Sequence, residues 1–213
     1  MIKNDLEKYY VKDILEVACG VGHMMAVLEE QGYGVTGLDL SEEMLKIART
    51  RIKGELVNQD MRGIELERVF DAVLCLGSSF TYMKREEDVD NALRCFNNCL
   101  RDGGILIFDN FNASRFDVSS HGKWEENVFC FDGLKIRRFV RSSCWNDKDL
   151  TWRVDWKYLI EKGVETTEVH DNAELRAFHE SYLRDKLSQH GFNVLRLLDE
   201  RRLMILAQKQ SSN

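Results

Sequence analysis

The chain has 213 residues, of which 44% are hydrophobic and 31% charged, and its formal net charge is −6. This length and composition are typical of one folded domain and exclude a disordered chain, and the excess of acidic residues argues against nucleic acid as a partner. Because its apolar runs are too short to cross a bilayer and its first residues are mixed and polar, we expect no membrane partner and a cytoplasmic location.

The first half of the chain alternates short β-rich runs with amphipathic helices. Strands are predicted at residues 14–18, 35–38, 56–58, 72–76 and 105–108. Helices are predicted at about 22–31, 41–51 and 89–100, where apolar residues recur at helical spacing. Gly32 ends the first of these helices and Ser41 caps the second. This alternation predicts an α/β fold with a Rossmann-like, doubly wound, mostly parallel sheet covered by helices on both faces.

After Asn110 the pattern changes to that of an antiparallel sheet. Apolar and polar residues alternate through 151–160, which is the mark of a strand with one buried face. Further strands are predicted at about 123–130, 135–140 and 164–170. We expect a single domain over residues 1–213, in which residues 111–170 form an inserted antiparallel lid that covers the substrate. A helix at 180–190 and strands at 193–197 and 203–207 follow.

Three loops at the carboxyl ends of the parallel strands carry the chemistry. Gly20 and Gly22 follow the first strand, where glycines let the backbone turn sharply and approach a ligand. Asp39 ends the second strand, where a carboxylate can accept both hydroxyls of a ribose, and Asp60 follows the third. A dinucleotide-binding loop has similar glycines, but it requires Gly or Ala at the position of Met25, which disfavours a nicotinamide-dependent dehydrogenase.

Six segments, in order and at the usual spacing, resemble the class I methyltransferases that use S-adenosylmethionine. They are ILEVACGVG, GLDLSEEML, ARTR, NQDMR, FDAVLCLGSSFTYM and LRDGGILIFDNFN, and the similarity resumes in ELRAFHESYLRDKLSQHGF. Within the class, SSFTYM and the inserted strands look most like the branch of amino-sugar N-methyltransferases and glycine N-methyltransferase-like enzymes. The resemblance implies S-adenosylmethionine as cofactor, S-adenosylhomocysteine as product and a small-molecule acceptor methylated on N or O. Ala18 departs from the glycine of many members, and Asp102 from their Pro-Gly-Gly.

The resemblance also implies which residues hold the cofactor. These residues lie in or beside the loops after the first four strands: Glu16, Ala18, Cys19, Gly20, Gly22, Asp39, Leu40, Asp60, Met61, Leu76 and Gly77. Glu16 would lie near the amino group of the methionine moiety, and Asp39 would accept from the ribose. Leu40 would pack on the adenine, and Asp60 would accept from its amino group.

The chemistry itself dictates no catalytic residue. The methyl group of a sulfonium is already activated, so the protein mainly aligns the acceptor, and a base matters only if the acceptor arrives protonated. Tyr82 should face the methyl group as a catalytic or substrate-binding residue, or be a packing aromatic. His170 is a candidate base or substrate ligand, or a surface histidine. Asn110 is a further candidate for substrate contact. Trp124, Trp152 and Trp156 could wall an acceptor pocket, although a tryptophan stripe at strand spacing is usually core.

Several alternatives stay open at this stage. The chain could be a catalytically silent module that binds S-adenosylmethionine, or an RNA methyltransferase, which its acidity disfavours. The basic residues Lys135, Arg137, Arg138 and Arg141 indicate a solvated face more than a site for an acidic substrate. The six cysteines contain no CxxC pair, so we expect reduced thiols and no metal site. The sequence is compatible with a monomer or a homodimer.

Overall fold

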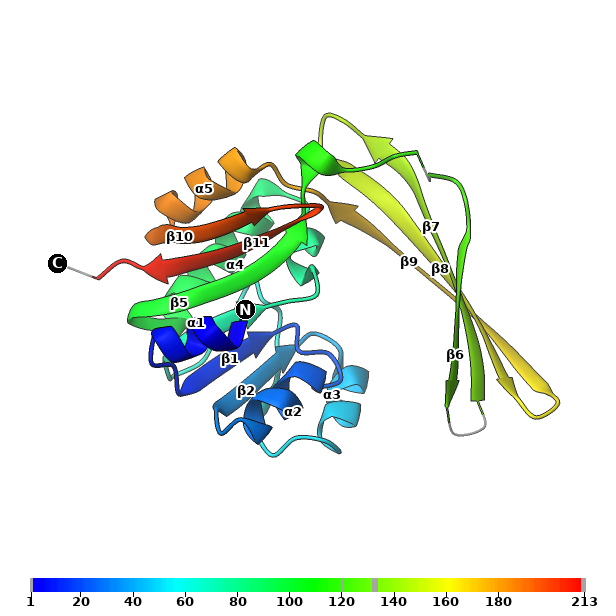
Figure 1. Ribbon diagram of the computed structural model, residues 1–213, viewed down its shortest axis with the longest axis horizontal. Coiled ribbons are helices and arrows are strands. Elements are labelled where there is room, and N and C mark those ends of the chain that lie inside the picture. The colour runs from blue at the N-terminus through cyan, green and yellow to red at the C-terminus, as the bar shows by residue number, and fades with distance from the viewer. Residues whose placement is uncertain (1, 120, 132–133, 212–213) are drawn as a thin grey trace.

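The computed structural model describes residues 2–119, 121–131 and 134–211. Its main sheet has seven strands in the order β10-β11-β5-β4-β1-β2-β3 (Figure 1). The parallel strands are β1 (Asp13–Val17), β2 (Gly34–Asp39), β3 (Leu56–Asn58), β4 (Phe70–Cys75) and β5 (Leu100–Phe111). The last two strands, β10 (Phe192–Asp199) and β11 (Arg202–Lys209), form a hairpin in which β11 runs antiparallel to β5. The predicted mostly parallel sheet is confirmed.

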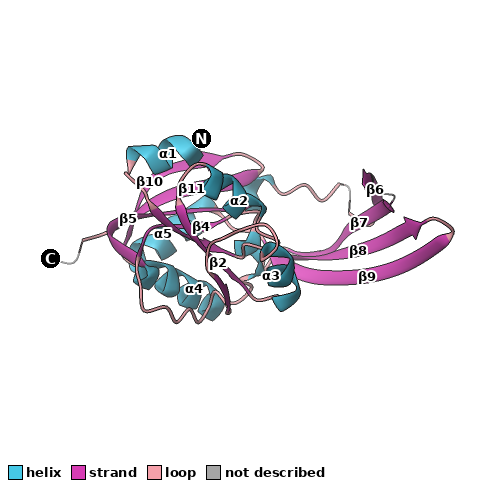
Figure 2. Cartoon of the chain, turned by 90° about the horizontal axis from the view of Figure 1, so that it is seen from below, coloured by secondary structure: helices cyan, strands magenta, loops and turns pink. Residues whose placement is uncertain are grey.

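Helices cover both faces of this sheet (Figures 1 and 2). On one face, Leu6, Met25 and Leu45 bury against the strands from α1 (Ile2–Lys8), α2 (His23–Glu30) and α3 (Glu42–Ala48). The other face carries α4 (Glu86–Cys99) and α5 (Glu180–Gln189). The doubly wound α/β class is therefore confirmed. None of the helices in the described ranges is long and apolar enough to cross a membrane.

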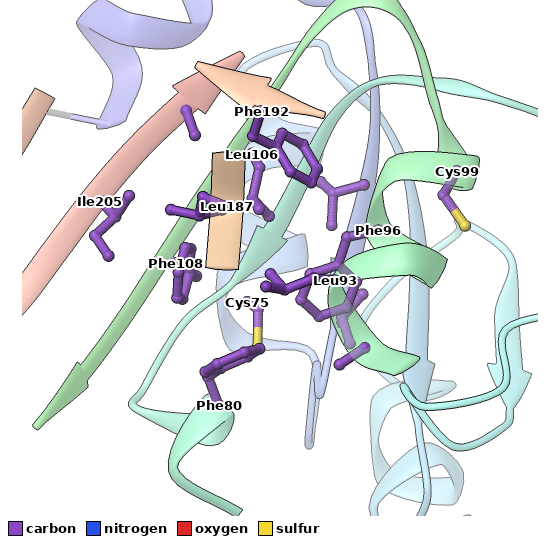
Figure 3. Close-up of a cluster of buried hydrophobic side chains, with 14 of the residues drawn as sticks. Cys75, Phe80, Leu93, Phe96, Cys99, Leu106, Phe108, Leu187, Phe192 and Ile205 are labelled. Atoms are coloured by element: carbon purple, nitrogen blue, oxygen red, sulfur yellow. The ribbon is translucent and has the colours of Figure 1, made fainter. Parts of the chain in front are cut away.

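The core beneath α4 and α5 fixes the segment that follows β4. In this core, Phe80 lies at one edge of a cluster of side chains from β4, β5 and α4, next to Cys75 (Figure 3). Phe80 is fully buried and its ring centroid lies 5.0 Å from that of Phe108 on β5. Because Phe80 belongs to the short 3-10 helix η1 (Ser79–Tyr82), its burial anchors the turn that carries Tyr82.

A separate four-stranded antiparallel sheet projects from the carboxyl-end side of the main sheet (Figures 1 and 2). Its strands are β6 (Glu125–Phe131), β7 (Leu134–Asn146), β8 (Thr151–Lys162) and β9 (Glu165–Arg176), paired in chain order. β7 and β9 are longer than the predicted 135–140 and 164–170, since both keep pairing with β8 as far as Asn146 and Arg176. Trp152, 2% exposed, packs the base of this sheet onto Phe111 at the end of β5.

Candidate active site

The loop from β1 to α2 has a backbone that is shaped for close approach. Ala18, Gly20 and Gly22 all adopt positive φ, at 56°, 55° and 76°. A side chain in this region costs about 1–2 kcal/mol, a cost that Ala18 bears and the two glycines avoid. A Cβ added to Gly20 would meet no atom within 4 Å among the described residues, so the loop faces open space there. This loop can receive a ligand against its main chain.

Asp39, at the end of β2, ties this loop to the next one. Its carboxylate accepts a 2.7 Å hydrogen bond from the Gly20 N–H and a 2.9 Å bond from the Ser41 N–H. The Asn58 side-chain amide donates to the main-chain carbonyls of Asp39 and Leu40, each at 2.9 Å. Leu40 remains 69% exposed beside this carboxylate. The Asp39 carboxylate and the apolar side chain of Leu40 thus lie side by side. A nucleoside needs both, an acceptor for its ribose hydroxyls and an apolar surface for its base.

Glu16 is a buried carboxyl with an unmet hydrogen-bonding atom. It is 5% exposed, and among the described residues its Oε2 has no partner. Burial raises the pKa of Glu16 to about 8, against the smaller lowering effect of a hydrogen bond from the Met25 main chain. A buried acceptor beneath the glycine loop fits a cationic group such as the ammonium of an amino acid.

Asp60, after β3, is held by its neighbour Arg62. The Arg62 guanidinium donates to both carboxylate oxygens, at 2.9 and 2.6 Å, and also to Asp88 at 3.0 Å. The hydrogen bonds from Arg62 hold the pKa of Asp60 below its ordinary value. Asp60 is therefore a fixed, ionised acceptor, and most of its lone pairs are already engaged by Arg62.

The turn after β4 is strained and firmly anchored. Gly77 and Ser78 both adopt positive φ, at 73° and 62°. The Asp109 carboxylate on β5 accepts from the Ser78 N–H at 3.0 Å and from its hydroxyl at 2.8 Å. These bonds hold the turn in place beside the end of β4, next to Leu76.

A cleft of about 720 Å³ opens from this turn toward the antiparallel sheet. Its walls include Gly77, Tyr82, Phe111, Phe116, Trp152 and Trp156. The volume lies within the range of small-molecule sites. The glycine loop and the cleft therefore flank the same edge of the main sheet, with the turn at Gly77 between them.

Known proteins with the same features identify the family. A family model described as a methyltransferase domain matches residues 14–104. The putative methyltransferase YqeM of Bacillus subtilis (strain 168) is 30% identical over 189 residues, covering 86% of this chain and 74% of YqeM. The chain belongs to the S-adenosylmethionine-dependent methyltransferases.

One further relative is similar in sequence, and one solved structure is similar in fold. A glycine/sarcosine N-methyltransferase of Aphanothece halophytica is 39% identical over 137 residues, which cover 61% of this methyltransferase and 52% of that relative. The solved structure of CalS10 of Micromonospora echinaspora, an amino pentose methyltransferase with S-adenosylmethionine bound, superposes with a TM-score of 0.81. It is 21% identical and covers 98% of this chain and 89% of CalS10. The chain thus spans about half the length of the glycine/sarcosine relative and most of the length of CalS10.

The predicted substrate residues separate into two groups in the structure. Tyr82 lines the cleft, half exposed, and burial, with smaller contributions from Asp171 and Tyr158, raises its pKa. Asn110 is fully buried, with neither side-chain amide atom paired among the described residues, and it does not line the cleft. His170 pairs across the sheet with Lys157, one residue on from the cleft-lining Trp156.

The sheet alternation turns His170 and Trp124 away from the cleft. Neighbouring residues on a strand face opposite sides, so His170 shares the outer face, where its Nε2 lies 2.6 Å from Glu168. Trp124 precedes the cleft-lining Glu125 in the chain. The Arg141 guanidinium lies over the Trp124 ring, 4.6 Å from the ring centroid. The structure does not bring these two predicted residues to the site.

Several residues that shape or line the cleft carried no sequence signal. Asp109 was not predicted, because its role depends on hydrogen bonds from β5 to Ser78, which follows the neighbouring strand β4. Phe116 and Arg201 come from irregular segments, where no periodicity marks them. For Trp152 and Trp156 the sequence left a pocket wall and a core position open, and Trp152 belongs to a hydrophobic cluster and also lines the cleft.

Proposed function

We propose that this methyltransferase transfers a methyl group to an amino group of a small molecule bound in the cleft. The observation that carries the proposal is the position of the Gly77 turn, which lines the cleft and follows the strand beside the glycine loop. A cofactor held by that loop would present its methyl group to the cleft. The names of the glycine/sarcosine relative and of CalS10, both enzymes for amine-bearing molecules, favour nitrogen as the acceptor atom.

The residues around the first two strands would bind the cofactor. Glu16 would accept from the amino group of its methionine moiety, filling the buried acceptor position that no described residue meets. The main chain from Ala18 to Gly20, together with Cys19 and Gly22, would cradle the same moiety. Asp39 would take the ribose hydroxyls, at the position from which it now binds Gly20.

The adenine would lie between the loops after β2 and β3. Leu40 would pack on its face, and the Met61 main chain would meet its edge. Asp60 would accept from the adenine amino group with the lone pair that Arg62 leaves free. Leu76 and Gly77 would line the cofactor pocket beside the methyl group.

The bound cofactor supplies a methyl group already activated by its sulfonium. What this chain contributes is alignment and exclusion of water. Phe111, Phe116 and Trp152 give one part of the cleft an apolar wall, which would shield a bound acceptor from water. Tyr82 would orient the acceptor by donating a hydrogen bond to a polar atom other than the attacking nitrogen, because its raised pKa keeps the phenol protonated near neutral pH. The nitrogen attacks as the free amine, so an acceptor that arrives as an ammonium must first release its proton to solvent.

Calorimetric titration with S-adenosylmethionine, S-adenosylhomocysteine and NADH tests the cofactor assignment, and methyl transfer to a panel of small amines and alcohols tests the acceptor. We expect micromolar binding of the first two ligands, no binding of NADH and turnover of an amine. Turnover of alcohols alone would contradict nitrogen as the acceptor. Binding without turnover of any small molecule, with salt-dependent retention on RNA, would contradict the whole proposal.

A further inference from the structure

The cleft carries a charge opposite to that of the whole chain. Although the formal net charge of the chain is −6, five of the residues that line the cleft are cationic. These residues are Arg115, Lys123, Arg138, Arg201 and Arg202. Among the described residues of the lining, Asp117 and Glu125 are the acidic ones, and His121 lies among the cations. A surplus of positive charge in a concave site favours an anionic ligand.

Two of these cations are engaged by carboxylates. Arg115 Nε lies 3.2 Å from Asp199, and Arg202 reaches Asp109 at 3.4 Å. For Lys123, Arg138 and Arg201, no carboxylate lies within ion-pair distance in the described parts of the chain. Lys123 and Arg138 therefore keep their charge available to the cleft. Arg201 shares the cleft with Asp117, whose pKa is lowered by the Ser119 main chain and in smaller part by the charge of Arg201.

Two buried nitrogen atoms in the cleft also have unmet hydrogen-bonding capacity. Nε2 of His121 and Nε of Arg138 are shielded from solvent, and neither has a partner among the described residues. Leaving such an atom unpaired in a buried place is unfavourable, so a bound hydrogen-bond acceptor would stabilise both side chains. Both residues pack against aromatic rings. The ring centroids of His121 and Phe116 are 5.7 Å apart, and the Arg138 guanidinium lies 5.6 Å from the centroid of the Phe129 ring.

The arginines on the two faces of β7 differ in whether they form ion pairs. On β7, Arg137 and Arg141 point away from the cleft, and each is neutralised, by Glu126 at 2.6 Å and by Asp155 at 2.9 Å. Arg138 lies between them in sequence and points into the cleft, where no described residue pairs with it. The outward arginines are thus solvated ion pairs, as the sequence suggested, and the inward one is a free cation.

We infer that the methyl acceptor bears an anionic group, a carboxylate or a phosphate, and that Arg138, Lys123, Arg201 and His121 bind it. The inference rests on the proposed function, because it names the substrate class of the same cleft. The anion would neutralise the unpaired cations and accept from His121 and Arg138, while the aromatic walls enclose the rest of the molecule. It would also fix the end of the acceptor remote from the methyl group, which orients the amine.

Calorimetric titration of the full chain with inorganic pyrophosphate and with glutarate, each with and without S-adenosylhomocysteine, tests this inference. We expect one of the two anions to bind, and Arg138→Gln and Arg201→Gln each to weaken its binding by about tenfold. Arg138→Lys, which keeps the charge, should retain part of the affinity. Preference for pyrophosphate would indicate a phosphate-bearing acceptor, and preference for glutarate a carboxylate-bearing one.

The matched control is Arg137→Gln, which removes an adjacent arginine from the other face of β7 and should change anion affinity by less than about twofold. An equal loss in Arg137→Gln and Arg138→Gln, or binding of neither anion to the folded wild type, overturns the inference. S-adenosylhomocysteine binding without anion binding would refute the inference alone. Anion binding that depends on Arg138 in a chain that does not bind S-adenosylhomocysteine would uphold the anion site and refute the proposed function.

Discussion

Ser78 is held in a left-handed conformation by the buried carboxylate of Asp109, which accepts both its N–H, at 3.0 Å, and its hydroxyl, at 2.8 Å. A serine with φ of 62° stores about 1–2 kcal/mol of backbone strain, and the two bonds to a charged acceptor offset it. The helix η1 starts immediately after Ser78 and ends at Tyr82, so Asp109 determines where Tyr82 lies in the cleft.

Asp109→Asn should destabilise the protein by about 2 kcal/mol, because the replacement removes a charge-assisted acceptor from a buried site. Urea unfolding measures the change. Because Asp109 anchors the turn that carries Gly77 and Tyr82, turnover should fall more than the affinity for S-adenosylhomocysteine. The control Asp185→Asn alters an exposed carboxylate of α5 and should leave stability unchanged within about 0.5 kcal/mol. Equal stability of the two variants would show that the Ser78 turn does not depend on Asp109.

Asp39→Ala should weaken S-adenosylhomocysteine binding by about 1–3 kcal/mol, since it removes a carboxylate that would accept from the ribose and that now positions Gly20. Calorimetry at fixed pH gives the affinity. Asp13→Ala, at the opposite end of β1, removes an acid that is half exposed and remote from the loop, and should have no effect. An unchanged affinity in folded Asp39→Ala would remove Asp39 from the site.

The sequence predicted the main sheet well because its signals are local. Strand ends and glycine loops can be read along the chain, and parallel strands bring their carboxyl ends to one edge, so Gly20 and Asp39 meet although 19 residues separate them. The residues of the cleft were harder to predict, because they come together through contacts between distant segments. Arg201, for example, is brought to the cleft because the next residue, Arg202, pairs with Phe111 on β5. His170, for which the sequence left a base, a substrate ligand or a surface histidine open, lies on the outer face of β9 beside Glu168.

Glu16→Gln should stabilise the ligand-free protein increasingly as the pH rises. The pKa of Glu16 is raised from 4.5 to about 8 by burial, so between these values the folded state keeps a proton that the unfolded state releases. Stability falls with pH across that window, by at most about 5 kcal/mol at 1.36 kcal/mol per unit. The difference between Glu16→Gln and wild type in urea unfolding should therefore be near zero below pH 4.5 and largest above pH 8.

The control for this pH dependence is Glu7→Gln, which alters a carboxylate that is 59% exposed. Its difference from the wild type should stay flat over the same pH range. A flat difference for Glu16→Gln as well would show that the Glu16 carboxyl is ionised in the folded, ligand-free protein.

Cofactor binding should release a proton from Glu16. An ammonium placed against this carboxyl favours its ionised form, so a group with a pKa of about 8 that is mostly protonated at neutral pH must lose its proton. Calorimetric titrations with S-adenosylhomocysteine at pH 7 in buffers of different ionisation enthalpy measure the release. We expect close to one proton for the wild type and close to none for Glu16→Gln. Equal release by the two proteins would assign the proton to another group.

Tyr82→Phe should lower kcat by about tenfold and leave S-adenosylhomocysteine affinity unchanged, because the hydroxyl would contact the acceptor and not the cofactor. Burial raises the Tyr82 pKa above 10, so the phenol is a donor throughout the assay range and the ratio of wild-type to variant kcat should not vary between pH 6 and pH 9. A ratio that grows with pH would instead mark Tyr82 as a base. Tyr33→Phe, outside the cleft, is the control, and equal activity of all three proteins would make Tyr82 a packing aromatic.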